Sequence, residues 1–209
     1  MNEKFYMLSK EKQQRIIHAG WKVFSRDIYR KCAVGEIAKE ADISKSLLFH
    51  YFKNKKELYL FLLSEAMRAA QEMIDVQKVL QKKDFFEILE SGMELKLRMM
   101  KEQPELSGFV LLAYYEKDEE VAKDVQEWAQ KVLEQYNEPL FAGIDIAQFA
   151  PGLDLEMMYL EMFWASDGCV RAMLQAGEVD LDRAQLVFRK LVDFWRSVYQ
   201  RKDYCGKRD

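Results

Sequence analysis

The chain has 209 residues, of which 49% are hydrophobic and 13% aromatic, and this composition excludes an intrinsically disordered protein. The chain has only three prolines and nine glycines, the residues that most often interrupt helices and strands. Residues that favour helices are abundant, and the composition therefore predicts an all-α fold. We expect about nine helices, divided between a small N-terminal domain and a larger C-terminal helical bundle.

The cysteine and histidine contents argue against a disulfide framework and against a metal centre. Three cysteines lie far apart without Cys-x-x-Cys spacing, and together with two histidines they cannot close a tetrahedral zinc site. The N-terminus lacks the pattern of a secretory signal, and the most apolar stretch, 157–165, is too short to cross a membrane. We therefore expect a cytoplasmic protein with no metal, no cofactor and no membrane partner.

Charge is distributed unevenly along the chain, although its formal sum is only −3. Through Leu60 there are 13 Lys and Arg residues against 7 Asp and Glu residues, whereas the remainder has 19 against 28. A basic end on an acidic body is typical of a protein that presents the basic end to a polyanion such as DNA.

Three helices are predicted at the basic end. Apolar residues at three- and four-residue spacing predict one helix over 9–26 and a second over about 34–41. Ser44 follows, and its hydroxyl can accept a hydrogen bond from a backbone N–H two or three residues further on, as an N-cap does. The sequence therefore predicts a third, short helix over 45–52, anchored inward by apolar residues four positions apart.

The rest of the chain is predicted to be one helix after another. Asn54 and Glu57 match a capping box, in which the first residue caps a helix and the second reaches back to the backbone, and they open a long helix that ends near Ile74. Pro139 and Pro151 bound the one predicted loop, over 137–152. The other predicted helices cover 84–101, 105–115, 118–136, 153–176 and 180–202.

Residues 34–58, VGEIAKEADISKSLLFHYFKNKKEL, combine these features in the pattern of a helix-turn-helix. In such a motif the first helix braces the second, whose N-terminal side chains enter the major groove of DNA. Lys45 and Ser46 stand at that point and can reach base edges or phosphates. A lysine cluster around Lys55 follows directly, where it can neutralise phosphates without reading sequence.

The same segment resembles the DNA-binding domain of the tetracycline-repressor (TetR) family, whose core pattern is I-A-x-x-A-x-V-S-x-x-x-[LI]-Y-x-[YH]-F-x-x-K-x-x-L. The tight turn, the serine N-cap, the apolar anchor residues and the lysines that follow the third helix all occur in this segment. The resemblance implies a helix-turn-helix DNA-binding domain over 1–53 and a ligand-binding and dimerisation domain over 54–209. The residues in register are Ile37, Ala38, Ala41, Ile43, Ser44, Leu48, Tyr51, Phe52, Lys55 and Leu58.

The resemblance also implies which side chains meet DNA. Where the family usually has a tyrosine this chain has Phe49, which lacks the hydroxyl that would bond a phosphate, and Leu47 replaces a frequent threonine and offers only apolar contact. The alternatives are that Phe49 packs beneath the turn and that His50 is an ordinary surface histidine. The implied DNA-binding residues are Ser44, chiefly a helix cap, with Lys45, Ser46, Leu47, Phe49, His50 and Lys55.

The C-terminal body carries two further predictions. Met157, Leu160 and Trp164 share the otherwise polar side of the penultimate helix, which indicates a second buried surface. The resemblance implies a homodimer through the last two helices, as a twofold operator requires. The candidate ligand-binding residues, each of which ordinary core packing explains equally well, are Met93, Leu97, Met100, Phe109 and Trp128.

Together these features predict a ligand-responsive transcriptional regulator. By resemblance it would be a repressor that binds a palindromic operator in double-stranded DNA as a homodimer and is released by an unknown small-molecule effector. The alternative is an all-helical small-molecule-binding or protein-interaction module without DNA binding. The sequence has no phosphate loop, no nucleophile-elbow glycines and no Glu-x-x-His pair, so we expect no catalytic residues and no enzymatic activity.

Overall fold

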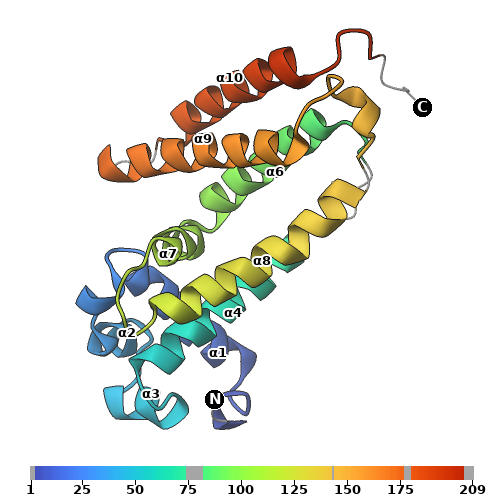
Figure 1. Ribbon diagram of the computed structural model, residues 1–209. Coiled ribbons are helices and arrows are strands. Elements are labelled where there is room, and N and C mark those ends of the chain that lie inside the picture. Colours follow the sequence, from blue (N-terminus) through green and yellow to red (C-terminus); the bar gives the residue numbers. More distant parts are fainter. Residues whose placement is uncertain (1–2, 74–81, 143, 177–179, 205–209) are drawn as a thin grey trace. The chain divides into compact units, whose positions relative to one another are not determined.

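A computed structural model describes residues 3–73, 82–142, 144–176 and 180–204. Within these ranges the chain forms nine α-helices, and its sole β-type pairing is one isolated bridge between Phe149 and Gln200, so the predicted all-α fold is confirmed (Figure 1). The short 3-10 turns are η1 (Glu3–Phe5), η2 (Tyr29–Lys31) and η3 (Ile146–Gln148). The helices are α1 (Lys10–Phe24), α2 (Val34–Glu40), α3 (Lys45–Tyr51), α4 (Lys55–Met73), α6 (Phe85–Glu102), α7 (Pro104–Tyr114), α8 (Ala122–Ala142), α9 (Leu155–Ala176) and α10 (Leu181–Tyr199).

The chain divides into two compact units. Unit 1 comprises 1–75 and 99–137, and unit 2 comprises 76–98 and 138–209. The predicted boundary at residue 53 separates a DNA-binding domain from a ligand-binding and dimerisation domain, and it stays a prediction. Unit 1 contains the whole of the predicted helix-turn-helix together with α4 and α7.

One hydrophobic core joins the three N-terminal helices to α4 and α7. Ile16 of α1, Leu48 of α3, Leu62 of α4 and Phe109 of α7 are all fully buried in it. The indole N–H of Trp21 also donates to the backbone carbonyl of Leu62, at 3.1 Å, which ties α1 to α4. Because burial of large apolar side chains contributes most of the stability of such a unit, the helix-turn-helix depends on α4 and α7 for its rigidity.

The N-terminal turn η1 is packed against the inner side of α3. Phe5 is fully buried, and its ring centre lies 5.3 Å from that of Phe52 and 5.0 Å from that of Phe61. The side-chain amide of Gln13 donates to the carbonyl of Leu8, at 2.8 Å, and holds the segment that leads into α1. The ring contact with Phe52 is tilted and that with Phe61 is edge-to-face, and both add to the burial of apolar surface.

Unit 2 has a separate core, in which α9 and α10 lie side by side (Figure 1). A buried glutamine, Gln148 of η3, organises its polar interior. Its side-chain oxygen accepts from the backbone N–H of Phe85, at 2.7 Å, and its amide donates to the carbonyls of Lys83 and Asp145. Every polar atom of this side chain therefore has a partner, as burial requires. The other core residues are Phe86, Phe149, Met158, Met162, Val192 and Trp195.

The predicted end of α8 and the predicted capping partner of Glu57 differ from the structure. The loop predicted from residue 137 is wrong at its start, because α8 begins at Ala122 and continues past Pro139 to Ala142. Pro139 lies in the last turn of α8, and because it has no N–H it cannot donate the hydrogen bond that other residues there make to the preceding turn. At the start of α4, Glu57 reaches back to the backbone N–H of Lys53, at 2.6 Å, one residue before the expected partner. The predicted end of α4 at Ile74 lies outside the described residues.

Candidate nucleic-acid interface

A short turn sets the angle between α2 and α3. Asp42 has a φ of 53°, the left-handed region that aspartate tolerates better than most residues. The backbone N–H of Ile43 donates to the carbonyl of Ala38, at 3.0 Å, and that of Asp42 donates to Lys39, at 3.1 Å. These two bonds form a Schellman motif, which ends α2 and turns the chain directly into α3.

The start of α3 is capped as predicted. The hydroxyl of Ser44 accepts from the backbone N–H of Leu47, at 3.1 Å, and α3 then runs from Lys45 to Tyr51. Leu48 and Phe52 are fully buried and fasten the inner side of α3 to the core of unit 1. The short helix is therefore fixed by its cap at one end and by two apolar anchors four residues apart.

The opposite side of α3 faces solvent. Leu47 and Phe49 are 38% and 39% exposed, so Phe49 does not pack beneath the turn. The ammonium of Lys45 lies 5.8 Å from the centre of the Phe49 ring, within cation–π range. Six of the seven predicted DNA-binding residues share this exposed surface of α3 and its cap, and contact with DNA stays a prediction for each. These six are Ser44, Lys45, Ser46, Leu47, Phe49 and His50.

The seventh predicted residue, Lys55, is turned toward the protein. Its ammonium donates to the carbonyl of Tyr29 and lies 4.2 Å from the centre of the Tyr29 ring. Burial lowers the pKa of Lys55, and nearby carboxylates partly offset that effect. Contact between Lys55 and a phosphate stays a prediction, and in the structure its ammonium already contacts Tyr29.

Carboxylates that the sequence analysis did not single out lie beside the basic residues. Asp118 accepts from Arg30, at 2.9 Å, and Asp124 pairs with Lys56, at 2.8 Å. Hydrogen bonds from the Glu120 N–H and from Arg30 hold the pKa of Asp118 below its ordinary value, and the Lys56 contact does the same for Asp124. The acidic run EKDEE at 116–120 is visible in the sequence, but its spacing does not indicate which basic residues its carboxylates contact.

The comparison with known families bears on this segment. The model of the family described as "Bacterial regulatory proteins, tetR family" matches residues 16–61. That range takes in most of α1, all of α2 and α3, and the start of α4. Residues 16–61 therefore resemble the DNA-binding domain of the TetR family. The resemblance seen in the sequence is thereby confirmed.

A curated relative of the TetR domain is the uncharacterized HTH-type transcriptional regulator YuxN of Bacillus subtilis (strain 168). It is 42% identical over 55 residues, which are 26% of this chain and only 19% of that protein. The match is thus confined to a small part of the relative's length.

Solved structures resemble most of the chain. FadR from Bacillus subtilis, in complex with stearoyl-CoA, has a TM-score of 0.68 at 20% identity, over 88% of this chain and 97% of that one. NalD, the secondary repressor of the MexAB-OprM multidrug efflux pump in Pseudomonas aeruginosa, has a TM-score of 0.66 at 15% identity, over 94% and 100%. At these identities the likeness shows a TetR-like fold.

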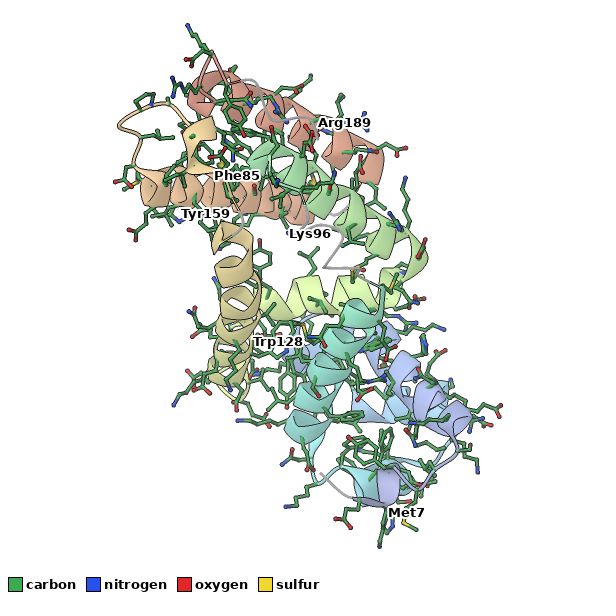
Figure 2. All side chains as sticks on the ribbon, turned by 90° about the vertical axis from the view of Figure 1, so that its right-hand side faces the viewer. Met7, Phe85, Lys96, Trp128, Tyr159 and Arg189 are labelled. Carbon is green, nitrogen blue, oxygen red and sulfur yellow. The ribbon has the colours of Figure 1, made fainter. Side chains whose placement is uncertain are left out.

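The candidate ligand-binding residues of this TetR-like chain fall into both units. Met93 and Leu97 line a cavity of about 250 Å³ between α6 and α10 in unit 2. In unit 1, Phe109 is fully buried with its ring centre 5.1 Å from that of Tyr59, and Trp128 of α8 packs against the same core (Figure 2). Met100 is half-buried. Their role toward a ligand stays a prediction.

Two absences hold for the described part of the TetR-like chain. Among residues 3–73, 82–142, 144–176 and 180–204, no three His, Cys, Asp or Glu side chains are grouped so that they could hold a metal ion. In the same ranges, none of the helices combines the length and the apolar character that crossing a membrane requires.

Proposed function

We propose that the chain is a ligand-responsive transcriptional repressor that binds a palindromic operator as a homodimer and is released by a small molecule. The outer surface of α3 carries this proposal, because a capped and anchored helix presents Lys45, Ser46 and Leu47 together to solvent. A single α-helix with such side chains fits the major groove, which is about 12 Å wide. A regulator of this kind acts where the DNA is, in the cytoplasm.

The roles proposed on α3 follow from chemistry. Lys45 can donate to the acceptors of guanine, Ser46 can donate to or accept from a base or phosphate, and Leu47 can contact a thymine methyl. Phe49 and His50 lie further along the exposed side, where they would meet the sugar-phosphate backbone. Lys55 would reach a phosphate only by giving up its contact with Tyr29.

The proposed dimer interface consists of α9 and α10. Trp164 of α9 is 59% exposed and Phe194 of α10 is 55% exposed, although both are large apolar side chains. Met157, Leu186 and Val198 of the same two helices are also exposed. Such a concentration of exposed apolar surface supports an interface, and a second copy of the chain would supply the second α3 that a twofold operator needs.

The proposed effector is a small molecule of unknown identity. FadR of Bacillus subtilis was solved in complex with stearoyl-CoA, so a TetR-like fold can accommodate a small-molecule ligand. The cavity between α6 and α10 has apolar side chains from Met93, Leu97 and Phe188, and its other five lining residues are polar or charged. We propose as effector contacts Met93, Leu97, Met100, Phe109 and Trp128.

The DNA-binding step is tested with duplexes selected from a random-sequence pool by the purified protein. Fluorescence anisotropy at about 50 and 200 mM salt should show affinity that falls steeply as salt rises. Lys45→Ala should relax the preference at particular base pairs, because it removes a groove contact. Lys131→Ala is the matched control, because Lys131 is an exposed lysine of α8, outside the helix-turn-helix, and its loss removes the same charge.

The outcomes separate the two candidate functions. Salt-dependent, sequence-selective binding by the parent, with altered selectivity only in Lys45→Ala, supports the repressor. Absence of binding at both salt concentrations would contradict it and favour the all-helical binding module that does not contact DNA. Equal selectivity in both variants would contradict the placement of Lys45 in the groove.

A further inference from the structure

A buried carboxylate lies in the connection between α7 and α8. Glu116 is only 8% exposed. Its Oε1 accepts from the backbone N–H groups of Lys117 and Asp118, both at 2.9 Å, and its Oε2 accepts from the backbone N–H of Tyr29, at 2.6 Å. Both oxygens act as acceptors, so the site fits a carboxylate and does not fit an amide, whose nitrogen can only donate.

The residue that Glu116 holds belongs to the helix-turn-helix. Tyr29 lies in η2, between α1 and α2, and its own carbonyl accepts from the ammonium of Lys55. The backbone N–H of Tyr29 therefore donates to a carboxylate, and the backbone carbonyl of Tyr29 accepts from an ammonium group. Charge-assisted hydrogen bonds are the stronger class of such contacts.

The contact between Tyr29 and Lys55 leads toward α3. Lys55 is the first residue of α4, and Phe52, three residues earlier, ends α3 with its ring buried in the core. Two direct contacts thus connect the α7–α8 connection to the start of α4, three residues after Phe52: Glu116 to Tyr29, and Tyr29 to Lys55. The parallel ion pair between Arg30 and Asp118 involves a largely exposed Arg30 side chain, so it contributes less to this connection.

We propose that Glu116 is a positioning residue for DNA recognition: it fixes the α1–α2 turn and, through Lys55, the orientation of α3, so that the α7–α8 connection controls affinity for specific DNA. This proposal rests on the proposed repressor function. In a dimer two α3 helices must meet two half-sites together, so a loose turn weakens specific binding more than it weakens general attraction to phosphate.

The loss of one negative charge distinguishes a positioning role from a purely electrostatic role, because the two roles predict opposite changes in DNA affinity. Glu116→Gln and Glu119→Gln each remove one negative charge from the same segment, and fewer negative charges should by themselves favour DNA binding. Glu119 is exposed and makes no hydrogen bond or ion pair among the described residues, so it is the matched control. If Glu116 positions α3, its variant should weaken specific binding while the control leaves it equal or slightly tighter.

Anisotropy titrations with the selected duplex and with a scrambled duplex measure the two effects in one experiment. For Glu116→Gln we expect about a tenfold loss of affinity for the selected duplex and little change for the scrambled one, a split that partial unfolding would not produce. Equal behaviour of the two variants, or equal losses on both duplexes, would overturn the proposal. Failure of the parent protein to bind either duplex would instead count against the repressor function.

Hydrogen exchange keeps the proposal testable if Glu116→Gln does not fold. In the parent protein the amide of Tyr29 should exchange as slowly as amides in the core of unit 1, because it donates to the buried Glu116 carboxylate. Exchange of this amide as fast as that of exposed loop amides would overturn the proposal without any variant and without DNA.

Discussion

The side chain of Leu62 on α4 lies directly over Gly20 on α1. A Cβ placed on Gly20 would overlap one methyl carbon of Leu62 and come within 2.9 Å of the other. Leu62 is fully buried and cannot move aside freely. The absence of a side chain at Gly20 is therefore what allows α1 and α4 to approach so closely.

Gly20→Ala should lower the free energy of unfolding by about 1–3 kcal/mol, because an added methyl overpacks a filled core. The control is Gly35→Ala in α2, where a Cβ meets nothing within 4 Å. In that helix the change should raise the free energy of unfolding by about 0.4–1 kcal/mol, because it reduces the freedom of the unfolded chain. Urea unfolding measures both, and equal effects would contradict the close approach at Gly20.

Ser44→Ala should lower the free energy of unfolding by about 1 kcal/mol, because the N–H of Leu47 loses its acceptor. Ser44→Asn should retain most of the stability, since asparagine caps helices as well as serine does. Thermal unfolding followed by circular dichroism compares the two variants. Equal losses in both would show that the hydroxyl has another function than capping.

Trp164→Glu and Phe194→Glu should each convert the proposed dimer into monomers, because a carboxylate cannot be buried unpaired in an apolar interface. Ile146→Glu is the control, since Ile146 is 69% exposed and lies in η3, outside α9 and α10. Sedimentation velocity gives the mass of each species. A control that also dissociates, or an unchanged mass in both interface variants, would argue against this interface.

Asp118 should contribute less stability as the pH falls. Its folded pKa is lower than the ordinary 3.8, first because its carboxylate accepts from the N–H of Glu120 and further because Arg30 donates to it. A lowered carboxyl pKa adds stability that is present above the unfolded pKa and is lost as the pH falls through the folded pKa.

Asp118→Asn keeps an acceptor for the Glu120 N–H but loses the charge. The difference in free energy of unfolding between parent and variant should be largest near about pH 6 and should shrink once the pH falls below about 4. Urea titrations across that range measure it, with Glu119→Gln as the control. A difference that does not vary with pH would show that the Asp118 charge plays no part.

Local patterns in the sequence were enough to predict most of the helices and the exposed side of α3. The cap at Ser44 is an example, because the hydroxyl and its partner Leu47 are three residues apart and both lie within one helical turn. The turn at Asp42 has the same local character, since its backbone bonds reach only a few residues.

Contacts between distant segments could not be predicted in this way. The bond between Glu116 and Tyr29 joins residues 87 positions apart, and no periodicity relates them. For the same reason the inward turn of Lys55 was missed: its sequence position resembles that of a phosphate ligand, but the acceptor on Tyr29 is supplied by the folded chain. The continuation of α8 past Pro139 was also missed, because a proline ordinarily breaks a helix locally.

The burial of Phe5 affects how this protein can be handled. Its ring packs beside Phe52 and Phe61, so a purification tag or fluorescent fusion joined close to residue 3 is attached to a segment that supports the inner side of α3. An attachment that displaces Phe5 would loosen that support and weaken DNA binding without touching the exposed side of α3. The failure of an N-terminal fusion to bind DNA would then report on the added segment, whereas a protein with its tag cleaved would show the behaviour of the chain itself.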